Sequence, residues 1–183
     1  NIDKEANNLE SDIDGFIGIG GGSVMDFIKA LAVVHSNRGS ICDFEFGLKK
    51  IETCKPIFLC PTTCGSGSEV TPYTVINNSE TLRKFTLSSD LLYAKEAAIN
   101  PYFLSNLPPR VKLNTSLDAF IHCLEALLNT NSSALTYPLS QEGLKIGAQY
   151  MKKIYSYDKD LNILQKAAKL SLFGGVSIAH NRT

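Results

Sequence analysis

"GFIGIGGGS", residues 15–23, decides the fold, because a short apolar run passes directly into four glycines within five positions. The apolar run is bounded by glycine and predicts a buried strand. From Ser23 to Val34 the apolar residues follow helical spacing, which predicts a helix that begins at the glycines. A strand, a glycine turn and a helix in this order indicate an α/β protein with a ligand site at the turn.

The glycine turn is a candidate phosphate site. Glycines let the backbone approach a pyrophosphate closely, and the N–H groups at a helix start favour an anion. The pattern differs from the usual dinucleotide GxGxxG, because serine stands where the third glycine falls. The serine hydroxyl either caps the helix or donates to a phosphate. The alternative is a tight turn without a ligand, and the density of glycines favours phosphate binding by Gly20, Gly21, Gly22 and Ser23.

A second candidate loop, "PTTCGSGSE" (61–69), follows the buried strand predicted for "PIFLCP" (56–61). Ligands of α/β sheets bind beyond the carboxyl ends of the strands. We therefore expect the strands at 16–19 and 57–60 to lie side by side and parallel, with both glycine loops at one edge. The hydroxyls of this loop suit a ribose or a nicotinamide amide, although such a loop is equally a solvated turn when taken alone. The residues that carry these hydroxyls are Thr62, Thr63, Ser66 and Ser68.

The rest of the chain divides into two parts. Residues 35–55 predict a loop with one short helix, "YTVIN" and "RKFTLSS" predict a hairpin around "NSETL", and "EAAIN" predicts a further strand. Helical periodicity then runs through 110–128, 132–154 and 159–179, without any further strand pattern. The stretch 100–109, rich in proline and turn residues, separates an α/β domain (1–105) from an all-helical domain (106–183).

"SLDAFIHCLEA", residues 116–126, is a candidate metal site. Asp118 and His122 are four residues apart, so a helix places a carboxylate and an imidazole on one face. Leu117, Ile121, Leu124 and Leu128 form an apolar stripe, which predicts that the pair lies at the edge of a buried seam. Most Asp and His pairs at this spacing are only surface contacts. A catalytic metal usually needs three or four protein ligands, so other residues must complete such a site.

Composition excludes several classes of protein. An apolar content of 44%, a charged content of 20% and a net charge of zero argue against nucleic-acid and acidic-membrane binding. Five cysteines without CxxC spacing argue against a disulfide framework and favour a cytoplasmic location. The chain begins with Asn1 in a polar segment, and neither end carries a clear cap. We therefore expect a piece of a longer protein, truncated at both ends.

Taken together, the motifs resemble the iron-containing alcohol dehydrogenase family. The resemblance runs through "GFIGIGGGSVMDFIKA", "PTTCGSGSEVT", "INPYFLSNLPP", "SLDAFIHCLEA" and "LFGGVSIAHN" in that order. It implies a Rossmann-like, parallel-sheet nucleotide-binding part followed by an all-helical metal-binding part, the dehydroquinate synthase-like architecture. Two departures are Asn100-Pro101 in place of Asp-Pro, and Ser66 in place of the family's threonine.

The resemblance also implies roles by position. It implies pyrophosphate binding by Gly21, Gly22 and Ser23, and a ribose and nicotinamide lining by Thr62, Thr63, Ser66 and Thr71. It places Val75 and Lys84 beside the cofactor, and makes Asp118 and His122 the first two metal ligands. The family's remaining ligands are histidines further along, and His180 falls too early to be one of them. No catalytic residue is assigned.

The implied activity is hydride transfer between NAD or NADP and an alcohol or aldehyde, with divalent iron or zinc as Lewis acid. The expected partners are that small substrate and further copies of the chain, in a homodimer or larger homo-oligomer. One alternative is a catalytically inactive nucleotide-binding module. Another is a relative of glycerol dehydrogenase or dehydroquinate synthase, although their differently placed ligands argue against it.

Overall fold

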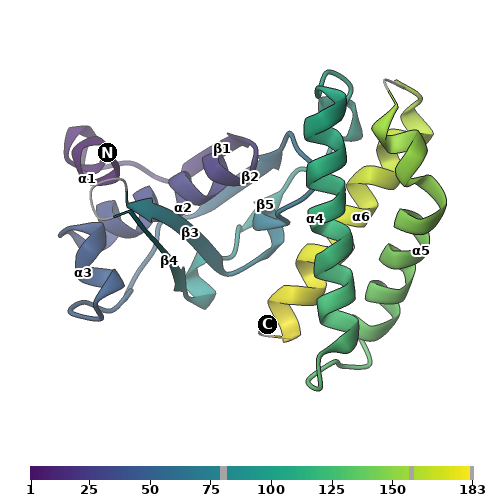
Figure 1. Ribbon diagram of the computed structural model, residues 1–183. Coiled ribbons are helices and arrows are strands. Elements are labelled where there is room, and N and C mark those ends of the chain that lie inside the picture. The colour runs from purple at the N-terminus through teal and green to yellow at the C-terminus, as the bar shows by residue number, and fades with distance from the viewer. Residues whose placement is uncertain (79–81, 157–158, 182–183) are drawn as a thin grey trace.

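The computed structural model describes residues 1–78, 82–156 and 159–181 (Figure 1). Strands and short helices occupy one side of the molecule, and three long helices occupy the other. The α/β side contains α1 (Ile2–Asn8), β1 (Phe16–Gly20), α2 (Gly22–Asn37), α3 (Ile41–Glu45), β2 (Ile57–Pro61), β3 (Tyr73–Asn78), β4 (Arg83–Ser88) and β5 (Glu96–Ala97). The long helices are α4 (Pro109–Leu128), α5 (Thr136–Tyr155) and α6 (Leu161–Asn181), and the 3-10 helices are η1 (Ser68–Val70), η2 (Asp90–Leu92) and η3 (Pro101–Leu104).

The central sheet is parallel, as its apolar runs and glycine loops predicted. β1 pairs with β2 from Phe16↔Ile57 to Gly20↔Pro61, and β2 pairs with β5 on its other side. The ladder continues one step beyond the strands, because the Thr62 amide donates to the Gly20 carbonyl at 2.9 Å. Both glycine loops therefore leave the sheet at the same edge, which confirms the predicted arrangement.

The smaller elements follow the sequence in part. β3 and β4 form the predicted antiparallel hairpin, with Val75 opposite Thr86. The centre of its turn, residues 79–81, lies outside the described residues. α3 is the single short helix predicted between residues 35 and 55, and the predicted strand in "EAAIN" is only two residues long. α1 was not predicted, because its seven residues, "IDKEANN", bury only Ala6 and show no apolar stripe.

The three long helices confirm the predicted helical part. They pack closely through small residues: a Cβ on Gly143 would lie 3.4 Å from the Cβ of Cys123, and one on Gly174 would lie 2.8 Å from the Ala119 carbonyl oxygen. α4 therefore presents its small side chains to α5 and α6. Within the described ranges, no helix combines the length and apolar character that crossing a bilayer requires.

The predicted orientation of α4 was wrong. The predicted apolar stripe beside the buried seam was Leu117, Ile121, Leu124 and Leu128. Leu124 is half-buried, but Leu117, Ile121 and Leu128 are 41%, 45% and 74% exposed. Apart from Lys112 near its start, the buried residues of α4 are smaller ones, Ser116, Ala119, Cys123 and Ala126. Large side chains would hold the helix axes apart, so close packing selects the small face and leaves the leucine stripe outside.

Candidate cofactor and metal site

The first glycine turn leaves the start of α2 open. Gly21 is the N-cap and has extended backbone geometry, and among the described residues no side chain caps the helix. Its carbonyl accepts from the amides of Val24 and Met25 at 3.0 and 3.1 Å. The N–H groups of Gly22 and Ser23 precede these bonds, so they lie where an anion binds. Ser23 is exposed and does not cap the helix, and phosphate binding by Ser23 stays a prediction.

The two glycine loops lie against each other. A Cβ on Gly22 would lie 2.6 Å from the Ser66 hydroxyl oxygen, and one on Gly21 would lie 3.2 Å from the Thr63 methyl. This close packing requires glycine at residue 22 even without a ligand. The phosphate prediction therefore rests on the uncapped helix start, and the glycines explain how Thr63 and Ser66 come so near to it.

The second loop also contacts the long helices. The Cys64 thiol lies 3.3 Å from the hydroxyl oxygens of both Thr115 and Ser116 on α4. A Cβ on Gly65 would lie 2.7 Å from the Thr115 carbonyl oxygen, so backbone meets backbone here. Thr115 precedes Asp118 by one helical turn. The loop thus joins the glycine turn on one side to the candidate metal ligands on the other.

Asp118 and His122 share one face of α4. The Asp118 Oδ1 and His122 Nε2 atoms are 3.8 Å apart, and the side chains are 54% and 20% exposed. A carboxylate oxygen and an imidazole nitrogen facing each other at this distance fit two ligands of one divalent cation. The described residues contain no third histidine, cysteine or carboxylate beside them. His122 Nδ1 is buried and has no hydrogen-bond partner among these residues. No hydrogen bond to this second ring nitrogen therefore fixes the orientation of the imidazole.

A buried charged group behind the second loop was missed in the sequence. Lys29 is fully buried, and its ammonium donates to the carbonyls of Ser68, Thr71 and Tyr73 at 2.6, 2.7 and 2.9 Å. The Asp26 carboxylate accepts from the Ser68 hydroxyl at 2.7 Å. Residues 25, 29 and 32 share one face of a helix, and Met25 and Ala32 are buried. Their spacing from Lys29 could therefore have predicted that Lys29 is buried as well.

Burial dominates the electrostatics of this group. It lowers the pKa of Lys29 to about 8, against the attraction of Asp26 and Glu69. It raises the pKa of Asp26, an effect that the Ser68 hydrogen bond and Lys29 partly offset. It likewise raises the pKa of Glu69. Lys29 and Asp26 therefore join α2 to the second loop through hydrogen bonds, and burial makes their charged forms energetically costly.

The remaining predicted cofactor residues lie apart from the loop contact. Thr71 is buried, and its hydroxyl donates to the Ser68 carbonyl at 3.4 Å. Val75 on β3 is half-buried, and Lys84 on β4 is exposed. Lys84 is near enough to Asp26 to lower the pKa of that carboxyl, so the hairpin reaches back toward α2.

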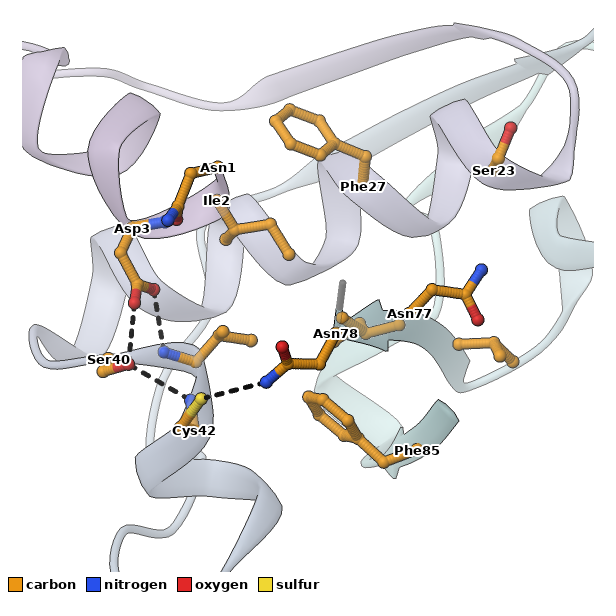
Figure 2. Close-up of a pocket in the computed structure, with 13 residues that line it drawn as sticks. Asn1, Ile2, Asp3, Ser23, Phe27, Ser40, Cys42, Asn77, Asn78 and Phe85 are labelled. Carbon is orange, nitrogen blue, oxygen red and sulfur yellow. Dashed lines mark hydrogen bonds between the residues drawn. The ribbon is translucent and has the colours of Figure 1, made fainter. Parts of the chain in front are cut away.

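A cavity of about 530 Å³ lies between α1, α2, α3 and the hairpin (Figure 2). Ser23 and Val75 are the predicted cofactor residues that line it. At its far end, the Asp3 carboxylate accepts from the Ser40 hydroxyl at 2.7 Å, and the Asn78 amide reaches toward the Cys42 sulfur (Figure 2). The cavity thus begins at the exposed start of α2 and extends away from α4.

Comparison with known proteins points in one direction. The profile of a family described as "Iron-containing alcohol dehydrogenase" matches residues 2–101. A choline dehydrogenase of Bacillus subtilis is 32% identical over 167 residues, which are 90% of this chain and 42% of that protein. The structure of an iron-containing alcohol dehydrogenase from Thermotoga maritima superposes with a TM-score of 0.88 and 29% identity, over 98% of this chain and 49% of the other.

A second solved structure from Thermotoga maritima, an NADH-dependent butanol dehydrogenase A, gives a TM-score of 0.79 at 26% identity. The superposition covers 97% of this chain and 45% of the butanol dehydrogenase. This chain therefore spans about half of the solved relatives, and about two fifths of the curated one.

Proposed function

This chain belongs to the iron-containing alcohol dehydrogenase family, and on that premise we propose that it provides the nucleotide loops and two metal ligands of an oxidoreductase. The proposed reaction is hydride transfer between a nicotinamide cofactor, NAD or NADP, and a small alcohol or aldehyde. A relative that is NADH-dependent by name supports NAD as the first cofactor to test.

One observation carries the proposal. The loop that holds Thr63 and Ser66 touches the glycine turn at one end and Thr115 at the other. A dinucleotide whose pyrophosphate lies on the turn would extend along this loop toward Asp118 and His122. A hydride donor and a metal-held substrate oxygen have to be neighbours, and this arrangement supports that requirement.

The chain's own residues would each do a simple task. The amides of Gly22 and Ser23 would bind the pyrophosphate, and the hydroxyls of Thr63 and Ser66 would orient the ribose and the nicotinamide amide. Asp118 and His122 would hold a divalent metal, iron or zinc. Such a metal supplies Lewis acidity for the oxygen of the alcohol or aldehyde.

The donor set fits that metal in kind but not in number. Oxygen and nitrogen ligands suit both iron and zinc, and the carboxylate offsets part of the charge. Two ligands leave a cation largely hydrated, so we expect this chain alone to retain little metal after dialysis, measured by elemental analysis. Tightly held, stoichiometric metal would show that another residue closes the site.

A titration of the chain with NADH, with and without added zinc, tests the proposal. If the site is a dehydrogenase site, NADH binds and added zinc changes its affinity, because nicotinamide and metal are neighbours. Replacing Asp118 by Ala removes the effect of zinc and leaves the affinity without zinc unchanged. An affinity for NADH that zinc never changes would favour the inactive nucleotide-binding module, and no binding at all would contradict the nucleotide site.

A further inference from the structure

A small cavity lies where the second glycine loop, η1, η3 and α6 meet. Its volume is about 10 Å³, which is the space that a single water molecule needs. It lies away from the metal pair, and neither Asp118 nor His122 lines it. The residues that line it include Thr63, Glu69, Asn100, Leu104, Ala168 and Ser171.

Two buried oxygen atoms that belong to lining residues have no hydrogen-bond partner among the described residues. They are Oε2 of Glu69 and Oγ of Ser171, and each residue is only 3% exposed. A buried polar atom without a partner is strongly disfavoured, and native proteins usually satisfy such atoms with protein or with ordered water. Glu69 belongs to η1 and Ser171 to α6, so residues of two separate elements meet at this cavity.

We propose that one ordered water molecule is a built part of this joint and bridges Glu69 to Ser171. The water donates a hydrogen bond to Glu69 Oε2 and accepts one from the Ser171 hydroxyl. A polar site with two or more partners and room for one molecule is the setting in which buried water is retained. A metal cation is disfavoured, because the described residues contain no group of three or more histidine, cysteine or carboxylate side chains that could hold one.

The bridge acts as a positioning device for the nucleotide loop. Thr63 lies between the cavity and Gly21, since it lines the cavity and a Cβ on Gly21 would lie 3.4 Å from its hydroxyl oxygen. The water therefore ties α6 to η1 next to Thr63, the residue proposed to orient the ribose. This consequence rests on the proposed nucleotide site, whereas the presence of the water does not.

Oxygen-17 relaxation dispersion counts long-lived buried waters and tests the bridge directly. Ser171→Val fills the cavity with methyl groups and should remove one such water, whereas Glu69→Gln keeps a polar partner and should retain it. Ser140→Val is the matched control, because Ser140 is also fully buried with an unpartnered hydroxyl, but lies on α5 and does not line the cavity. An equal water count in the wild type and Ser171→Val would overturn the proposal.

A crystal structure of the wild type provides a test that needs no variant to fold. It should show one water between Glu69 and Ser171, and a direct hydrogen bond between the two side chains would overturn the proposal. NADH titration then tests the positioning role: Ser171→Val should weaken binding several-fold and Ser140→Val should not. Loss of the water without any loss of affinity would overturn that role, and a wild type that binds no NADH would refute the proposed function while leaving the water count valid.

Discussion

At the scale of single residues, buried contacts were the hardest feature to predict from the sequence, and Lys29 shows why. A lysine in an amphipathic helix is normally read as a solvent-facing charge, and the three carbonyls that it contacts lie 39 to 44 residues further along. No local pattern announces such partners. The glycines of the turn were readable, by contrast, because their density is itself a local feature.

Replacing Lys29 by Met should destabilise the fold by about 3 kcal/mol at pH 7, because three buried carbonyls lose their donor. Lys145→Met is the control, since that side chain is 67% exposed and should change stability by less than about 0.5 kcal/mol. Urea unfolding of the three proteins measures the difference. Equal stability of the wild type and Lys29→Met would show that the carbonyl contacts contribute nothing.

The pH dependence of the same comparison has a definite sign. The pKa of Lys29 falls from 10.5 to about 8 on folding, so the unfolded chain holds the proton more strongly. Stability then rises with pH across this window, and the wild type should gain about 2 kcal/mol over Lys29→Met between pH 8 and pH 10. Burial raises the pKa of Cys54 and Cys123 to about 11 and 12, which lowers stability above pH 9 in both proteins and cancels in the difference.

At the scale of helices and strands, the prediction succeeded wherever the hydrophobic pattern extended over many residues. The three helices of the second part and the strand–turn–helix of the first carry strong patterns over many residues, and the structure has them all. The seven residues of α1 and the short 3-10 helices are too brief for any period to show. The face of α4 was assigned wrongly because size, rather than hydrophobicity alone, decides which side of a closely packed helix is buried.

Gly175 on α6 tests this size argument. A Cβ there would lie 2.7 Å from the Gly67 Cα and 2.8 Å from a methyl of Val70, so Gly175→Ala forces backbone apart. Alanine favours a helix over glycine by about 1 kcal/mol, and the exposed Gln165→Ala gives a reference for an alanine substitution in α6 without a packing change. We nevertheless expect Gly175→Ala to lower the unfolding free energy by about 1–3 kcal/mol, measured by urea titration. Increased stability would mean that the loop can move away from α6 at no cost.

At the scale of the whole molecule, the parallel pairing of β1 with β2 followed from two apolar runs that each end in a glycine loop. The contact of the second loop with α4 and α6 was not predictable, because it depends on glycine-to-backbone approaches between segments about 50 to 110 residues apart. Those contacts bring the proposed nucleotide and metal sites close to each other, although the nucleotide loops belong to the α/β side of the molecule and the metal pair belongs to α4. Changes at one site should therefore spare the other.

Gly22→Ala and His122→Ala should consequently give opposite results. Gly22→Ala should weaken NADH binding, but added zinc should still change the NADH affinity. His122→Ala should keep the NADH affinity measured without zinc and lose the effect of zinc. NADH calorimetry with and without zinc measures both, with the exposed His180→Ala as the control for a histidine outside the site. An unaltered zinc response in His122→Ala would return Asp118 and His122 to a plain helix-surface pair.

The cause of any loss in Gly22→Ala needs a further variant, because a Cβ at this position would also meet Ser66, 2.6 Å from its hydroxyl oxygen and 2.8 Å from its Cβ. Ser66→Gly removes that steric conflict. We expect the double variant, Gly22→Ala with Ser66→Gly, to melt at the same temperature as Ser66→Gly alone. Its affinity for NADH should still be weaker than that of Ser66→Gly, because the added methyl blocks the pyrophosphate from the backbone. If the double variant binds NADH as well as Ser66→Gly does, glycine is required at residue 22 for loop packing alone, and the pyrophosphate must lie elsewhere.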